Sequence, residues 1–231
     1  MIELFIICSC TTDNDINKII SGGETNISLN DVGKEQATKL VNYFTKYHNN
    51  IDLLISSNQS NAFETGDIIA KALNKQIYKE SILDEKNLGI FNGVKETDLD
   101  NMENIVEPIS SIDNKLREWL KLENKFYNKY TDQVDIALRF DKFVAKYSGF
   151  TGIESKTELK SRIKHLIDFI LENQQDKKII IVSHPLYIKN FLSYLMNACD
   201  LPIYIKAGSI SYVRYDNNFK ICLINDITHL E

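Results

Sequence analysis

The chain opens with Ile2-Glu3-Leu4-Phe5-Ile6-Ile7-Cys8-Ser9-Cys10, a nearly unbroken apolar run that ends in small, polarisable side chains. A short apolar run rich in β-branched residues predicts a strand buried on both faces, at the centre of a parallel sheet. In open α/β sheets, ligands bind beyond the carboxyl ends of the strands. Cys8, Ser9 and Cys10 are therefore the first candidates for a functional site.

Strand and helix patterns alternate along the chain that follows this run. Further strands are expected at 52–56, 76–78, 178–183, 204–215 and 219–225, and helices at 30–47, 61–73, 155–170 and 186–196. Consecutive β-helix-β units imply right-handed crossovers and parallel pairing. The pattern predicts an α/β protein, a three-layer α/β/α sandwich whose central sheet is mostly parallel with one antiparallel edge strand.

The composition changes between residues 96 and 150, where the sequence becomes polar, aromatic and helical in pattern. This segment is expected to form a helical cap inserted into a single domain that spans residues 1–231.

Charge and cysteine content restrict the classes of partner and the compartment. The net charge of −5 supplies no basic field for nucleic acid or an anionic membrane. No stretch approaches the roughly 20 apolar residues that a membrane span needs. The four cysteines show no framework spacing, and Glu3 stands where a signal peptide would carry basic residues, so a cytoplasmic protein is expected. No cofactor is expected, and the partner is an unidentified protein or small molecule.

Several segments, in the correct order, resemble the histidine phosphatase superfamily, whose best-known member is the cofactor-dependent phosphoglycerate mutase. Segment 28–37 (Ser-Leu-Asn-Asp-Val-Gly-Lys-Glu-Gln-Ala) is similar to the family's P-L-T-x-x-G-x-x-Q-A, and 56–65 (Ser-Ser-Asn-Gln-Ser-Asn-Ala-Phe-Glu-Thr) is similar to S-S-x-x-x-R-A-x-Q-T. Segment 83–93 resembles L-x-E-x-x-x-G-x-x-E-G, and 152–155 resembles G-G-E-S. Residues 182–184 match V-S-H-G, with Pro185 in place of the glycine. The likeness implies a phosphoglycerate mutase-like fold.

The departures from that family concern the groups that would hold and attack a phosphate. The resemblance places Cys8, Ser9, Cys10 and Thr11 at the family's R-H-G-E motif, and Asn61 at its second arginine. Glu85 and His184 match the family's acidic residue and second histidine. Asn14 lies near the position of a further polar residue of the pocket.

These losses predict that phosphohistidine turnover is absent. In the family, the first histidine attacks phosphorus, the arginines hold the phosphoryl oxygens, and the acidic residue protonates the leaving oxygen. The hydroxyl of Ser9 is shorter than an imidazole and needs a base to become nucleophilic. One arginine is worth about 10³–10⁵ in phosphoryl-transfer rate. Each lost contact forfeits roughly 4 kcal/mol of Coulomb energy at 4 Å with an effective dielectric of 20.

Three functions follow as hypotheses. The first is a binding or regulatory pseudoenzyme that keeps the fold. The second is a phosphomonoester hydrolase, or another hydrolase, with Ser9, Cys8 or Cys10 as a rebuilt nucleophile, His184 as base and Glu85 as acid or orienting group. Alternate strand residues share a face, so Cys8 and Cys10 are expected to point the same way. The third is a metal site formed by Cys8, Cys10 and His184 with Glu85, although C-x-C is not the usual zinc spacing.

The retained groups also have structural interpretations. Ser9 can cap the end of its strand, and Cys8 and Cys10 can serve as small buried apolar groups. Glu85 can form a salt bridge with Lys86 or bind a helix N-terminus. Conversely, Lys86 or Lys189 could replace a missing arginine, which would favour the rebuilt enzyme.

Overall fold

The computed structural model describes residues 1–97, 152–198 and 203–231. The helices and strands are β1 (Ile2–Cys8), α1 (Asp13–Ile16), α2 (Asp31–Tyr47), β2 (Leu53–Ser56), α3 (Ser60–Ala72), β3 (Ile77–Lys79), α7 (Lys156–Asn173), β4 (Lys178–Ser183), α8 (Pro185–Leu195), β5 (Ile210–Asp216) and β6 (Asn218–Asp226), with short 3-10 turns at Ser81–Leu83, Gly89–Phe91 and Thr228–Leu230. The expected cap at 96–150 lies almost wholly outside the described residues. None of the described helices is long and apolar enough to cross a bilayer.

The strands form one six-stranded mixed sheet in the order β3-β2-β4-β1-β5-β6. β1 pairs in parallel with β4, and β2 pairs in parallel with both β4 and β3. β5 runs antiparallel to β1 and to the edge strand β6. The predicted mostly parallel sheet with antiparallel pairing at one edge is confirmed, and the strand of opposite direction is β5, one place in from that edge.

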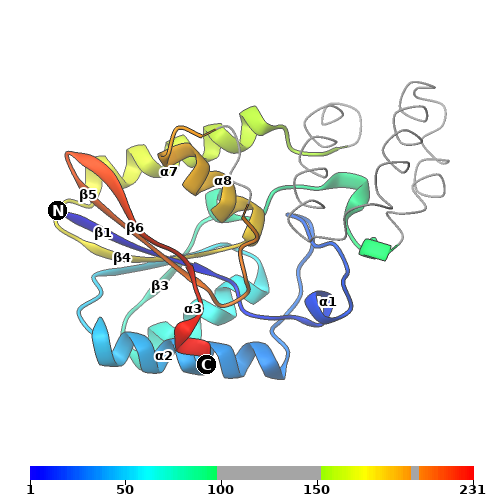
Figure 1. Ribbon diagram of the computed structural model, residues 1–231, viewed down its shortest axis with the longest axis horizontal. Coiled ribbons are helices and arrows are strands. Elements are labelled where there is room, and N and C mark those ends of the chain that lie inside the picture. Colours follow the sequence, from blue (N-terminus) through cyan, green and yellow to red (C-terminus); the bar gives the residue numbers. More distant parts are fainter. Residues whose placement is uncertain (98–151, 199–202) are drawn as a thin grey trace.

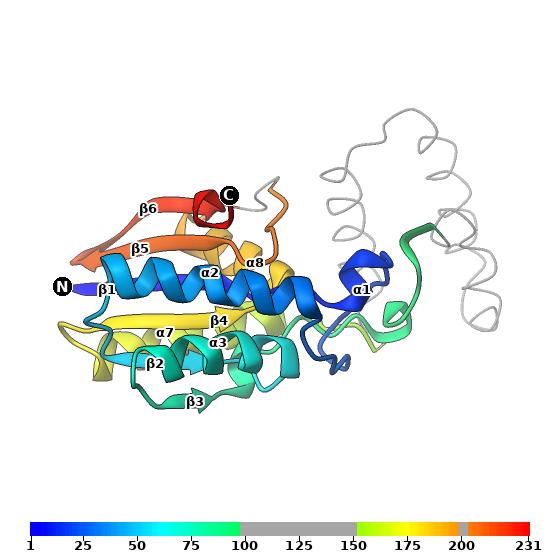
Figure 2. The same ribbon diagram turned by 90° about the horizontal axis from the view of Figure 1, so that it is seen from below.

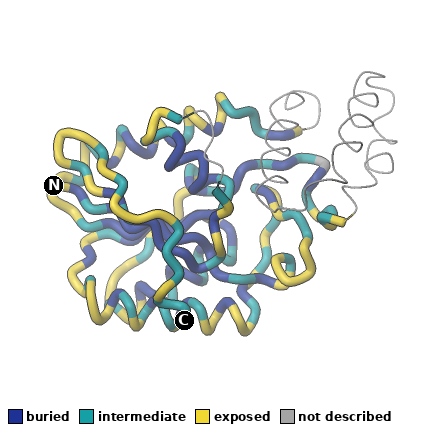
Figure 3. Tube along the Cα trace, in the orientation of Figure 1, coloured by how far each residue is buried: buried dark blue, intermediate teal, exposed yellow. Residues whose placement is uncertain are grey.

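Helices cover both faces of the sheet and complete the three layers (Figure 1). α2 and α3 lie on one face, as the view from below shows, and α7 and α8 lie on the other (Figure 2). Buried residues concentrate in the sheet and on the inner faces of these helices (Figure 3). Side chains alternate along β1, so Leu4, Ile6 and Cys8 join the core under α7 and α8 whereas Phe5 and Ile7 join the core over α2 and α3.

The strand β5 is shorter than the sequence predicted, because residues 204–209 are not part of it. The end of this segment is instead hydrogen-bonded to the end of β1. Gly208 adopts a φ of +70°, which an L side chain rarely adopts, and its N–H lies 3.1 Å from the Cys8 carbonyl. The Cys8 N–H in turn donates to the Ser209 carbonyl at 3.0 Å. The strand therefore begins at Ile210, and the backbone before it closes one side of the site.

Candidate functional site

A cavity of about 460 Å³ lies where β1, β2 and β4 end, the place that the parallel sheet predicts for a site. Ser9 at the end of β1, Asn61 on α3, Glu85 in the loop after β3 and His184 at the start of α8 all line it. Three of the four are almost fully buried, Asn61 being half-buried. The structure thus brings together four of the seven residues that the sequence singled out.

Family motif residues hold the backbone that leads into this cavity. The Cys10 N–H donates to the Thr65 hydroxyl at 3.0 Å, and the Thr11 N–H donates to Gln36 Oε1 at 2.9 Å. A Cβ atom on Gly33 would lie 2.1 Å from the Thr11 carbonyl oxygen, so only glycine allows α2 to approach this closely. These motif positions therefore have a structural purpose that does not depend on phosphate chemistry.

Cys8 and Cys10 point to opposite faces of the sheet, so the expectation of a shared face is wrong. The strand ends at Cys8, and its alternation ends with it. Cys10 is then bonded to α3 through its N–H and packs in the core on that side. Neither side chain lines the cavity. Burial raises the pKa of the Cys8 thiol and raises that of Cys10 to about 12.

Two hypotheses of the sequence fail on this geometry. A cysteine nucleophile is excluded for the observed arrangement, because both thiols are protonated and face the core. Separate faces also prevent Cys8, Cys10 and His184 from sharing a metal ion. Among the residues that the structure describes, no group of three or more His, Cys, Asp or Glu side chains could hold one.

Asn14 also lies outside the cavity wall. Its amide donates to the Ser21 hydroxyl at 2.8 Å. The predicted role of Asn14 in a ligand pocket is therefore not supported, because its amide is bonded to Ser21 outside the wall.

Glu85 caps the first turn of α8 from a distant loop. One of its carboxylate oxygens accepts the N–H of Tyr187 at 2.9 Å and the N–H of Lys86 at 2.7 Å, and the other accepts the N–H of Leu186 at 2.9 Å. Pro185 stands at the first helical position and supplies no N–H. The helix N-terminus interpretation of Glu85 is confirmed. Burial raises its pKa to about 7, and the three N–H donors and the Arg162 charge oppose that rise.

His184 is held by a chain of hydrogen bonds from the neighbouring strand. Its Nε2 atom lies 2.9 Å from the Ser57 hydroxyl, which donates to Asp84 Oδ1 at 2.7 Å. An ionised carboxylate only accepts, and a serine carries one hydroxyl proton, so Nε2 must carry the proton donated to Ser57. Burial, with the Arg162 charge as a smaller cause, lowers the pKa of His184 to about 3. His184 is therefore a neutral ring, not a cation.

The tautomer places the lone pair of His184 on Nδ1, opposite Ser9. The Ser9 hydroxyl lies 3.5 Å from Nδ1, and Asn61 Nδ2 donates to the same hydroxyl at 3.2 Å. The backbone N–H of Ser9 is bonded to the Ser183 carbonyl at 2.8 Å. Ser9 thus bonds both the residue at the lost arginine position and the retained histidine.

Arg162 is a residue that sequence reasoning missed. It forms a paired salt bridge with Glu154, 2.7 Å for each N–O pair, and donates to the carbonyls of Ile82 and Asp84 at 2.9 Å. It therefore fixes the loop that carries Asp84 and Glu85. The sequence feature that could have identified Arg162 is its position on the helix after segment 152–155, on the side that packs against the rest of the protein.

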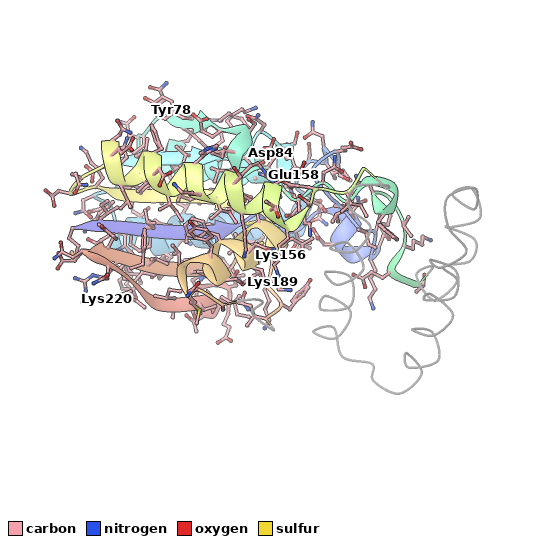
Figure 4. The ribbon with its side chains drawn as sticks, turned by 90° about the horizontal axis from the view of Figure 1, so that it is seen from above. Tyr78, Asp84, Lys156, Glu158, Lys189 and Lys220 are labelled. Atoms are coloured by element: carbon pink, nitrogen blue, oxygen red, sulfur yellow. The ribbon has the colours of Figure 1, made fainter. Side chains whose placement is uncertain are left out.

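Charges along the described cavity wall favour ligands other than a phosphate dianion. The acidic and basic lining residues besides His184 are Asp15, Glu85, Glu96 and Lys189. Lys189 is buried and engaged in an interaction of its own. Asp84 and Lys189 both lie toward the end of the sheet where β1 and β4 finish, far from Lys220 (Figure 4). Lys86 is not part of this wall, so Lys189 is the one replacement cation that the described residues offer.

Comparison with known proteins agrees with this architecture. The family model described as histidine phosphatase superfamily (branch 1) matches residues 4–108 and 107–226. A broad-specificity phosphatase of Saccharomyces cerevisiae is 30% identical over 101 residues, which cover 42% of this chain and 44% of that protein. The chain thus spans less than half the length of this curated relative.

Solved structures share the fold over almost the whole chain. Bacillus stearothermophilus YhfR superposes with a TM-score of 0.76 at 16% identity, covering 100% of both chains. The phosphoglycerate mutase of Bacillus anthracis gives 0.74 at 20% identity, covering 99% of this chain and 95% of its own. A mycobacterial glucosyl-3-phosphoglycerate phosphatase gives 0.71 at 14% identity, covering 97% and 99%. With the family model matched along both parts of the chain, this protein belongs to the histidine phosphatase superfamily.

Proposed function

We propose that this member of the superfamily no longer carries out phosphohistidine chemistry and keeps its pocket as a binding site, which makes it a binding or regulatory pseudoenzyme with respect to phosphate esters. The observation that carries the proposal is the pair Ser9 and Asn61, bonded to each other where the family has its nucleophilic histidine and an arginine. Neither side chain can form a phosphohistidine or neutralise a phosphoryl oxygen.

The retained residues do not compensate for this loss. His184 is neutral, and Glu85 directs both carboxylate oxygens at backbone N–H groups of α8 and its own loop. A phosphate dianion in the cavity would face the carboxylates of Asp15, Glu85 and Glu96. Among the described lining residues, Lys189 is the one basic side chain that could oppose them. The negative charges of the phosphate and of these carboxylates would repel each other strongly in a low-dielectric site. An uncharged or cationic organic ligand fits the lining better, and the cavity has the size of a small-molecule site.

Hydrolysis of a generic phosphomonoester tests the proposal. Purified chain is assayed with p-nitrophenyl phosphate from pH 5 to 8, alongside Ser9→Ala, His184→Gln and a mock purification. We expect the wild-type rate to equal that of both variants and of the mock sample. Turnover by the wild type that Ser9→Ala or His184→Gln removes would overturn the proposal, as would an acid-labile phosphoryl adduct on His184.

A further inference from the structure

We infer that Ser9 is the nucleophile of a serine hydrolase site for uncharged carboxylic esters, with His184 as its general base, Ser57 and Asp84 as the groups that orient the base, and Asn61 as the donor to the carbonyl oxygen. This inference rests on the proposed function, because an uncharged ester can occupy the pocket only if the pocket no longer serves a phosphate dianion.

The first support is the order of the hydrogen bonds. A nucleophile within reach of a base, and a base oriented by a third group, is the arrangement that marks an activated serine. Here the series runs from Ser9 to His184 at 3.5 Å, from His184 to Ser57 at 2.9 Å, and from Ser57 to Asp84 at 2.7 Å. The distance between nucleophile and base is the longest of the three, and it is still within the range of a hydrogen bond.

The second support is the direction of each proton. Ser57 donates to Asp84, so the ring of His184 presents Nε2–H to Ser57 and its lone pair to Ser9. Asn61 donates to Ser9 Oγ, which leaves the Ser9 O–H to donate toward Nδ1. The proton that an attacking serine must lose thus already points at the atom that would accept it.

The third support is the surrounding wall. Ser9 is buried yet lines the cavity, whereas Cys8 and Cys10 on either side do not. The Asn61 amide carries two N–H bonds and directs one of them at Ser9 Oγ; we assign the other to the carbonyl oxygen of an ester bound beside Ser9. The apolar part of the wall, suited to the acyl or alkyl chain of an ester, consists largely of Ile16, Ile19, Ile20, Ile27, Ile203 and Ile205.

The reaction balances with water as the second reactant. Ser9 Oγ bonds to the ester carbonyl carbon as its proton moves to His184 Nδ1. The imidazolium that forms is stabilised by its Nε2–H bond to Ser57, whose hydroxyl donates to Asp84. The tetrahedral adduct collapses, the C–O bond to the alcohol breaks, and the alkoxide takes the proton from Nδ1. Water then attacks the acyl-serine as one of its protons moves to Nδ1. The C–Oγ bond breaks, Ser9 Oγ takes that proton back from Nδ1, and the carboxylic acid is released.

The test combines turnover with covalent labelling. Full-length chain is assayed with p-nitrophenyl acetate, butyrate and octanoate, and is labelled with an uncharged fluorophosphonate probe whose site is located by peptide mass spectrometry. We expect a single adduct on Ser9 and a preference for butyrate or octanoate over acetate. Ser9→Ala should lose turnover by roughly 100-fold or more and Asp84→Asn by roughly 10-fold or more, since oriented bases contribute on this scale.

Ser60→Ala is the matched control, because this hydroxyl lies at the start of α3 and is not part of the hydrogen-bond series. Its turnover should stay within about twofold of the wild type. Thermal unfolding of each variant verifies that the fold is intact, and Asp84→Asn keeps the test decisive if Ser9→Ala is unstable. No ester turnover, equal turnover in Ser9→Ala, or an adduct on another residue would overturn the inference while the proposed function stands. Phosphomonoester turnover would instead overturn the proposed function itself.

Discussion

The floor of the pocket has two halves that differ in what their residues do for the rest of the molecule. On the half formed by β4, α8 and the loop after β3, His184 and Glu85 match the family, and both are bonded into the fold. On the half formed by the ends of β1 and β2 and the start of α3, Ser9 and Asn61 depart from the family. Asn61 donates to the Ser9 hydroxyl, which also lies 3.5 Å from His184 Nδ1. Residues kept at an old site can thus be kept for the fold, so their retention alone is weak support for catalysis.

The largest expected effect is the pH dependence of stability contributed by His184, in the half of the pocket that matches the family. The folded-state pKa of His184 is lowered from 6.5 to about 3, so its contribution to stability is present above pH 6.5 and is lost as the pH falls through 3. The full change is about 5 kcal/mol, taking 1.36 kcal/mol per pKa unit. Unfolding by urea, measured from pH 3 to 8, should show this rise in the difference in stability between the wild type and His184→Gln.

Glu85 should act in the opposite direction within part of that range. Its pKa is raised from 4.5 to about 7, so its contribution to stability is present below pH 4.5 and is lost as the pH rises through 7. Relative to the wild type, Glu85→Gln should therefore become more stable with rising pH between 4.5 and 7, by about 3 kcal/mol in total. A difference that is constant over this range would contradict the assigned titration.

Removing the Glu85 carboxylate altogether should destabilise the half of the pocket that matches the family. Glu85→Ala leaves the N–H groups of Lys86, Leu186 and Tyr187 without their acceptor, and each buried unsatisfied donor costs about 1–3 kcal/mol. We expect a loss of about 3 kcal/mol or more in the free energy of unfolding at pH 7. Ser9→Ala, measured in the same urea series, is the control from the other half.

Arg162→Lys should have an intermediate effect. Lysine cannot reproduce the paired bond to Glu154 together with the bonds to the carbonyls of Ile82 and Asp84. A loss of about 2 kcal/mol is expected, since each of the missing charge-assisted bonds is worth about 1.5–3 kcal/mol and lysine restores some of them. Urea unfolding provides the value, and a change below 0.5 kcal/mol would show that this residue does not hold the loop.

The smallest effects on stability should come from the half of the pocket that departs from the family. Asn61→Ala removes the hydrogen bond to Ser9, and Ser9→Ala removes that bond together with the 3.5 Å contact to His184; a neutral hydrogen bond is worth about 0.5–1.5 kcal/mol. Both should unfold within about 1.5 kcal/mol of the wild type. If either variant lost as much stability as Glu85→Ala, the contrast between the two halves would be wrong.

Local sequence patterns predicted the framework because its signals are local. The strand at 178–183 lies where the apolar run placed it, and the helix expected from residue 61 begins one residue earlier, at Ser60. The end of β1 was less predictable. Alternation gives the direction of Cys8, but Cys10 follows the bond that its N–H makes to Thr65 on α3, which no local pattern contains.

The contacts of the site depend on segments far apart in the chain. Glu85 meets the N–H groups of α8 about 100 residues away, and Ser57 joins His184 to Asp84 across two strand ends. The family motifs identified Glu85 and His184 but gave no indication of these partners. The neutral state of His184 likewise follows from burial, which only the packed structure shows.

Titration with orthovanadate, a mimic of the phosphoryl group, tests the central claim most directly. Isothermal titration calorimetry of the wild type should show no saturable binding, because Ser9 and Asn61 provide no cation. Asn61→Arg should gain saturable binding, because its guanidinium can form charge-assisted hydrogen bonds to the vanadate oxygens. Asn58→Arg, which adds the same charge at an exposed position near the pocket, should not. Saturable binding by the wild type that is lost in Ser9→Ala would show that the pocket still binds a phosphoryl group. That result would contradict the proposed loss of phosphate chemistry.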